Sequence, residues 1–99
     1  MVEMIGDFEG LAEVFKALAH PVRLQILIKT IDAELCVQDL QDDLDRSQPN
    51  ISQHLTVLRE RGLVVAERKG KRVCYRPADD RIAQVIRLAA GTLERLEAL

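Results

Sequence analysis

Apolar residues recur every three or four positions along both ends of the chain, which is the pattern of amphipathic helices. Residues 7–19 carry the first such series: Phe8, Leu11, Ala12, Phe15, Leu18 and Ala19. The pattern restarts at Pro21, because His20 before a proline avoids the helical region and proline suits a first helical turn. The second predicted helix runs to about Ile31, with these residues facing inward: Leu24, Leu27, Ile28 and Ile31.

The middle of the chain predicts shorter elements. Residues 34–37 are β-prone, and residues 39–44 predict a short helix. Ser47 is a good N-cap for a longer helix over residues 48–61, and Gly62 is suited to ending it. One stripe of that helix is apolar: Ile51, Leu55 and Leu58.

After Gly62 the apolar period changes to that of strands. Residues 63–69 and 72–77 are rich in valine, and Gly70 can take the positive φ of a hairpin turn between them. A last helix is predicted from Asp79 or Asp80 to about Ala98. This order predicts a mainly α fold with a small β-wing, a winged helix-turn-helix, as one domain over residues 1–99.

The charge distribution is uneven. The net charge is −2, but residues 46–76 hold eight bases against two acids, while residues 1–45 hold three bases against ten acids. A local basic surface is what binds a polyanion, so the distribution favours nucleic acid as a partner. Residues 1–10 carry acids where a signal peptide needs bases, and no apolar run could span a bilayer, so a cytoplasmic protein without membrane contact is expected.

The candidate DNA contacts lie on the capped helix and on the hairpin that follows it. A helical wheel places Gln53 and Thr56 opposite the apolar stripe, and polar side chains at a helix N-terminus suit base edges in the major groove. His54 falls at the border of that stripe, where a hydrogen bond at the rim of the core is favoured over a phosphate contact. The full set is Ser47, Gln48, Pro49, Asn50, Ser52, Gln53, Thr56 and Arg59 on the helix, and Arg68, Lys69, Lys71 and Arg72 on the hairpin.

Four segments resemble the ArsR/SmtB-type family of bacterial winged-helix repressors: VFKALAHPVRLQIL, ELCVQDL, SQPNISQHLTVLRERGLV and GKRVCYRP. The resemblance covers residues 11–96, and its DNA-reading positions fall on Gln48, Pro49, Ser52 and Gln53. It implies a homodimer that binds an inverted-repeat operator in double-stranded DNA and leaves it when an inducer binds. It also implies an interface between the first and last helices, where the apolar residues are Phe8, Leu11, Phe15, Ile82, Val85, Ile86, Ala89, Leu93 and Leu96.

The inducer is not evident, and no metal or cofactor is expected. Some members carry a second cysteine where this chain has Gln38, and the last helix contains no histidine. Cys36 and Cys74 are expected to be reduced and to lie on neighbouring strands. The hypothesis is a thiol pair that responds to oxidants, sulfur species or a thiophilic metalloid such as arsenite; the alternative is two buried apolar residues.

Two other function classes fit the sequence less well. A winged helix that binds protein would not need eight bases within residues 46–76. An enzyme is not expected, because the chain lacks a Gly-rich phosphate loop, paired carboxylates and a Cys–His–acid arrangement at recognisable spacing.

Overall fold

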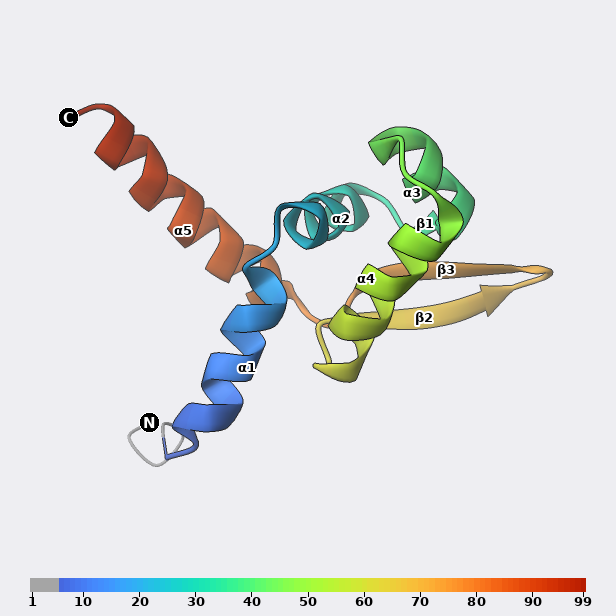
Figure 1. The fold of residues 1–99 in the computed structure, drawn as a ribbon, viewed down its shortest axis with the longest axis horizontal. Helices are drawn as coiled ribbons and strands as arrows, with labels where there is room; N and C mark the ends of the chain where they lie inside the picture. The colour runs from blue at the N-terminus through green and yellow to red at the C-terminus, as the bar shows by residue number, and fades with distance from the viewer. Residues whose placement is uncertain (1–5) are drawn as a thin grey trace.

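The computed structural model describes residues 6–99 as a helical body from which a β-hairpin extends (Figure 1). Residues 1–5, half of the segment judged against a signal peptide, lie outside the described residues. The elements are α1 (Phe8–Leu18), α2 (Pro21–Asp32), β1 (Leu35–Cys36), α3 (Val37–Leu44), α4 (Gln48–Glu60), β2 (Val64–Lys69), β3 (Arg72–Pro77) and α5 (Asp80–Glu97). The predicted mainly α fold with a small wing is therefore confirmed.

Side-chain caps define where several helices begin. Asp7 accepts a hydrogen bond from the Gly10 amide at 2.8 Å, and Asp79 accepts one from the Arg81 amide at 2.7 Å. Each cap satisfies a backbone donor that has no partner within the helix. The start predicted for α3 at residue 39 was wrong, since the helix begins at Val37.

The early start of α3 has a local cause. The Asp39 carboxylate accepts a hydrogen bond from the Cys36 amide at 2.9 Å, which places Asp39 in the first turn rather than before it. Carboxylates in a first turn also interact favourably with the positive end of the helix dipole. The acid that suggested a helix start therefore lies inside the helix.

The core forms where α2, α3 and α4 pack against the sheet. Its most deeply buried side chains are Ile26, Leu27, Leu40, Ile51, Leu55, Leu58 and Val64. The inward face predicted for α2 was partly wrong: Ile26 was omitted, and Ile28 is 49% exposed. The reason is that α2 packs most closely on β3 and α4, whereas Ile28 lines an open groove beside α5.

The sheet joins α3 to the wing. Its strand order is β1-β3-β2 and both pairings are antiparallel, with Cys36 opposite Cys74 and Lys69 opposite Arg72. Gly70 has φ 65° in the turn, a conformation that costs glycine little. The β2–β3 hairpin points away from the helical body, while α1 and α5 extend from the opposite side (Figure 1).

We expect Leu58→Ala to lower the free energy of unfolding by about 2–5 kcal/mol, because it leaves a cavity at a fully buried position in α4. Leu88→Ala, at a position 75% exposed on α5, is the matched control and should change stability by less than about 0.5 kcal/mol. Urea unfolding followed by circular dichroism measures both. Equal losses would contradict this assignment of the core.

Candidate DNA-binding surface

The outward face of α4 is polar and exposed. Ser47 caps the helix by accepting a hydrogen bond from the Asn50 amide at 3.3 Å. The Gln48 amide donates to the Ser52 hydroxyl at 2.5 Å, and the Thr56 hydroxyl donates to the Ser52 carbonyl at 2.9 Å. These hydrogen bonds hold the Gln48 and Thr56 side chains close to the surface of α4.

Other predicted contacts on α4 differ in their availability. Pro49, Gln53 and Arg59 are exposed, and the Gln53 amide makes no hydrogen bond within residues 6–99. Asn50 is half-buried, and its Oδ1 is enclosed without a hydrogen-bond partner in the described part of the chain. Gln53 therefore presents both unused donors and an unused acceptor on this face.

The wing is basic, but two of its four predicted cations are already paired. Lys69 Nζ lies 2.7 Å from Glu34 Oε1, and an Arg72 guanidinium nitrogen lies 3.1 Å from Asp39 Oδ2. Arg68 donates through Nε to the Gly70 carbonyl at 3.3 Å. The sequence suggested a cluster of four free cations at the hairpin tip, whereas the structure shows two of them in ion pairs.

These ion pairs change the titration of the groups that form them. The hydrogen bond and charge of Glu34 raise the pKa of Lys69 above its ordinary value. The Cys36 amide, followed by Arg72, lowers the pKa of Asp39. Both cations are exposed and both acids are half-buried, so water and salt screen these pairs and they contribute little stability. A phosphate group can therefore compete with Glu34 and Asp39 for the same cations.

Sequence reasoning missed these two acids as partners of the wing. Glu34 lies just before β1, and Asp39 lies in the first turn of α3. In the sequence, the only indication of these contacts was that both acids lie close to Cys36, the residue on the strand expected to pair with the wing. Since the partners are separated by more than thirty residues in the chain, only tertiary contact shows them together.

Cys36 and Cys74 face each other across β1 and β3 and are joined by a disulfide, with their Cα atoms 3.9 Å apart. Their predicted adjacency is confirmed, whereas the expectation of two reduced thiols was wrong for this structure. Both residues are only 6% exposed. The bond ties the residue that precedes α3 to β3, the second strand of the wing.

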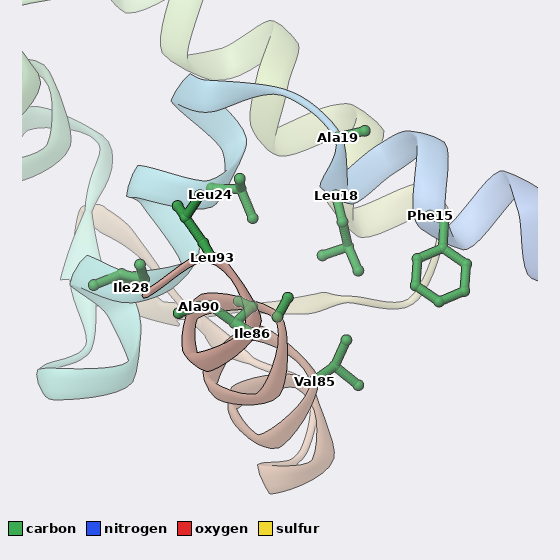
Figure 2. A pocket seen from close by; sticks show the side chains of 10 residues that line it. Phe15, Leu18, Ala19, Leu24, Ile28, Val85, Ile86, Ala90 and Leu93 are labelled. Carbon is green, nitrogen blue, oxygen red and sulfur yellow. The ribbon is translucent and has the colours of Figure 1, made fainter. Parts of the chain in front are cut away.

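An apolar groove lies between α1, α2 and α5 (Figure 2). The wing points away from the side of the molecule on which α1 and α5 extend (Figure 1). Its volume is about 390 Å³. Figure 2 shows apolar side chains of all three helices around the same space, and the lining residues are Phe15, Leu18, Ala19, Leu24, Ile28, Val85, Ile86, Ala89, Ala90 and Leu93.

The predicted interface residues divide into two groups. Phe15, Val85, Ile86, Ala89 and Leu93 line the groove, and three others are exposed elsewhere on α1 and α5: Phe8, Leu11 and Leu96. Ile82 was placed wrongly on this surface, because its side chain is buried in the chain's own core at the start of α5. Position 82 lies where α5 still contacts β3 and α2.

Within residues 6–99 no cluster of three or more histidine, cysteine or acidic side chains could hold a metal ion. Over the same residues, no helix has the length and apolar character to cross a membrane.

Comparison with known proteins identifies the family. Residues 20–65 match the arsR family of bacterial regulatory proteins. The chain is 40% identical to the HTH-type transcriptional repressor SmtB of Mycobacterium tuberculosis. The alignment spans 78 residues, which are 79% of this chain. Its fold matches the crystal structure of M. tuberculosis Rv0081 with a TM-score of 0.87, at 36% identity over 92% of both chains. This chain belongs to the arsR family.

A second solved structure adds information on assembly. The arsR-family chain described here matches the homodimeric winged helix-turn-helix DNA-binding domain of Mb0332 from Mycobacterium bovis with a TM-score of 0.81. The identity is 32%, and the match covers 87% of this chain and 80% of the other. The chain spans 58% of the length of the SmtB repressor that it matches. ArsR-family proteins are transcriptional regulators rather than enzymes, which agrees with the expectation from the sequence that this chain is not an enzyme.

We expect Glu34→Gln to strengthen binding to unrelated DNA duplexes, because it releases Lys69 from its ion pair. The slope of log affinity against log salt should steepen by about 1 per chain. Glu97→Gln, at the end of α5, makes the same change in net charge away from the wing and is the control. Equal effects of the two variants in salt-titrated fluorescence anisotropy would show that net charge is responsible, not the ion pair.

Proposed function

We propose that this chain is a transcriptional repressor that binds an inverted-repeat operator as a homodimer and is released by an inducer acting through Cys36 and Cys74. The observation that carries the DNA-binding part is the position of the exposed polar face of α4 next to a basic wing. SmtB, its relative, is a transcriptional repressor by name. The sensing part is supported by the pairing of the two cysteines.

The recognition helix α4 supplies the sequence readout in this proposal. Its N-terminal half presents Gln48, Pro49, Ser52 and Gln53, and a helix of this kind enters the major groove with its N-terminal residues at the base edges. Amides of its first turn can bind a phosphate. The wing cations contact the backbone or the minor groove, which adds affinity with little sequence information.

The homodimer is supported by apolar surface that a single chain leaves uncovered. Phe8 is 68% exposed, Phe15 is 53% exposed and Leu93 is 56% exposed, all on α1 and α5. Apolar surface of this kind marks an interaction site. The similar Mb0332 domain is homodimeric. A two-fold axis between the chains would place two recognition helices for the two halves of an inverted repeat.

A role for the cysteines in controlling the wing is supported by their position between the acids and the wing cations. In the disulfide form, β1 is covalently held to β3, and Glu34 and Asp39 stay beside Lys69 and Arg72. Two-electron reduction with uptake of two protons gives two thiols and removes that constraint. An oxidant or a reactive sulfur species would restore the bond, and arsenite would instead bridge both sulfurs. Both the disulfide and the arsenite-bridged form favour the ion pairs of Glu34 with Lys69 and of Asp39 with Arg72. These ion pairs lower the affinity of the wing for DNA.

The main alternative is a winged-helix module that binds protein and has no specific DNA site. The two differ in salt dependence, because binding to DNA releases counterions from the phosphates. Affinity for duplex DNA should therefore fall steeply as salt rises. An affinity that stays flat in salt for every duplex tested would favour the protein-binding module.

We expect Gln53→Ala to weaken operator binding by about 1–3 kcal/mol and to relax the preference at one base pair, because Gln53 has unused donors and acceptors. Lys71→Gln, on the exposed wing, should instead weaken all duplexes about equally and reduce the salt slope by about 1 per chain. Competition binding with single-base operator variants measures both. A uniform loss for Gln53→Ala would mean that Gln53 does not read a base.

We expect operator affinity of the reduced wild-type protein to fall about 5- to 150-fold on treatment with diamide or arsenite, the usual range for coupling between two sites. The double variant Cys36→Ser, Cys74→Ser should bind the operator and keep its affinity under the same treatment. Gel-shift titration measures this, with release by high salt as the control in both proteins. Release of the double variant by these reagents would remove the thiols from the sensing role.

A further inference from the structure

Arg23 connects the end of α1 to the recognition helix. Its Nε donates to the Ala17 carbonyl at 2.6 Å, and one terminal nitrogen donates to the Lys16 carbonyl at 3.2 Å. Its other terminal nitrogen lies 3.3 Å from Nδ1 of His54 on α4. One guanidinium on α2 therefore fixes the C-terminal turn of α1 and contacts the recognition helix at the same time.

The chemistry of arginine determines the protonation of His54 in this contact. Arg23 is a donor only and stays charged, so Nδ1 of His54 must be the acceptor and its ring must be neutral, with the proton on Nε2. The His20 ring lies nearby, with centroids 4.4 Å apart, and its own Nδ1 accepts from the Val22 amide at 3.1 Å. His20 is thus occupied in capping α2 and does not replace His54 as the acceptor.

The surroundings of His54 oppose a second proton. Its side chain is buried, and burial followed by the charges of His20, Arg23 and Arg46 lowers its pKa below the ordinary value of 6.5. These groups come from α2, from its N-cap and from the turn before α4, and none of them is an acid. A protonated His54 would lose its acceptor and place a positive charge against a guanidinium.

We infer that Arg23 and His54 form a proton-sensitive link that positions the recognition helix against α1, so that acidification weakens operator recognition. This inference rests on the proposed operator binding. His54 is next to Gln53 in the chain but lies about 100° around α4 from it, on the buried side, so its role is to position the helix. Glu13 of α1 holds the other end of the same helix through Arg61 at 3.2 Å.

The orientation of α4 relative to α1 matters because α1 carries part of the proposed dimer surface. In a two-fold dimer, that orientation sets the distance and angle between the two recognition helices, and the spacing of half-sites on DNA tolerates little change. Loss of the Arg23–His54 bond would leave α4 held by its apolar stripe alone on that side. Affinity for the operator would then fall more than affinity for unrelated DNA.

The sign of the pH effect follows from the lowered pKa. Above the ordinary histidine pKa, about 6.5, His54 is neutral whether or not the link is formed, and the link is complete. As pH falls below that value, the unlinked or unfolded state takes up a proton more readily than the linked state, so the link loses stability. A direct contact of His54 with phosphate would have the opposite effect, because protonation would then strengthen DNA binding.

The test compares the full-length wild-type protein with His54→Asn, whose Oδ1 can accept the Arg23 bond but does not titrate. For the wild type we expect operator affinity to fall several-fold between about pH 7.5 and about pH 5.5, because the unlinked state takes up the proton more readily. His54→Asn should bind with nearly constant affinity over that range. His20→Asn keeps a capping side chain on α2 but removes one of the charges that lower the pKa of His54, so it should keep a fall in affinity on acidification, with its midpoint shifted.

Several results would overturn the inference. These are a wild-type affinity that is constant or rises on acidification, a fall of equal size in His54→Asn, or a profile abolished by His20→Asn. Circular dichroism at each pH must show folded protein, so that loss of binding is not unfolding. Nuclear magnetic resonance of the wild-type histidine rings gives a readout without any variant: a protonated Nδ1 on His54 at neutral pH would also overturn it.

The same experiments separate this inference from the proposed function. Absence of operator binding at about pH 7.5 would contradict the repressor proposal, whereas the ring protonation of His54 is measured without DNA. Binding at neutral pH with no dependence on His54 would contradict the link alone.

Discussion

The burial of one stripe of α4 is the constraint on which the DNA-binding surface depends. Ile51, Leu55 and Leu58 are almost completely removed from water against α2, α3 and the sheet. Because a helix has a fixed rotation per residue, burying that stripe turns Gln53 and Thr56 outward. The Ser47 cap then sets where the helix begins, so that the polar residues of its first two turns stand at its exposed N-terminal end. The apolar core in this way determines which side chains can meet DNA.

Charge acts on this framework at two levels. The acids of residues 1–45 and the bases of residues 46–76 are separated in sequence, but the fold brings two of the acids back to the wing. Glu34 and Asp39 flank Cys36. Their partners Lys69 and Arg72 lie opposite each other at the turn end of the β2–β3 hairpin, whose β3 strand carries Cys74. The disulfide therefore joins the segments that carry both ion pairs. The buried pair of cysteines therefore lies between the acids and the cations of the wing.

Polar links and apolar surface connect the recognition helix to the part of the molecule that a second chain would cover. Arg23 and Arg61 join α4 to α1 at separate points, through His54 and Glu13. Beyond them, α1 and α5 carry exposed apolar side chains and the groove shown in Figure 2. A change in the position of α4 relative to α1 would for this reason change the geometry of a dimer formed through α1 and α5. This holds even though α4 itself contributes no residue to the groove.

The sequence alone determined the element order, the Ser47 cap, the Gly70 turn and the adjacency of Cys36 and Cys74, because these follow from local periodicity, capping chemistry and a known topology. It did not determine the exposure of Ile28, the burial of Ile82, the early start of α3 or the pairing of Lys69 and Arg72. Those features depend on which helix faces touch and on charges more than thirty residues apart. Local patterns specify that a face is apolar, whereas only packing in three dimensions decides which part of that face is covered and which acid meets which base.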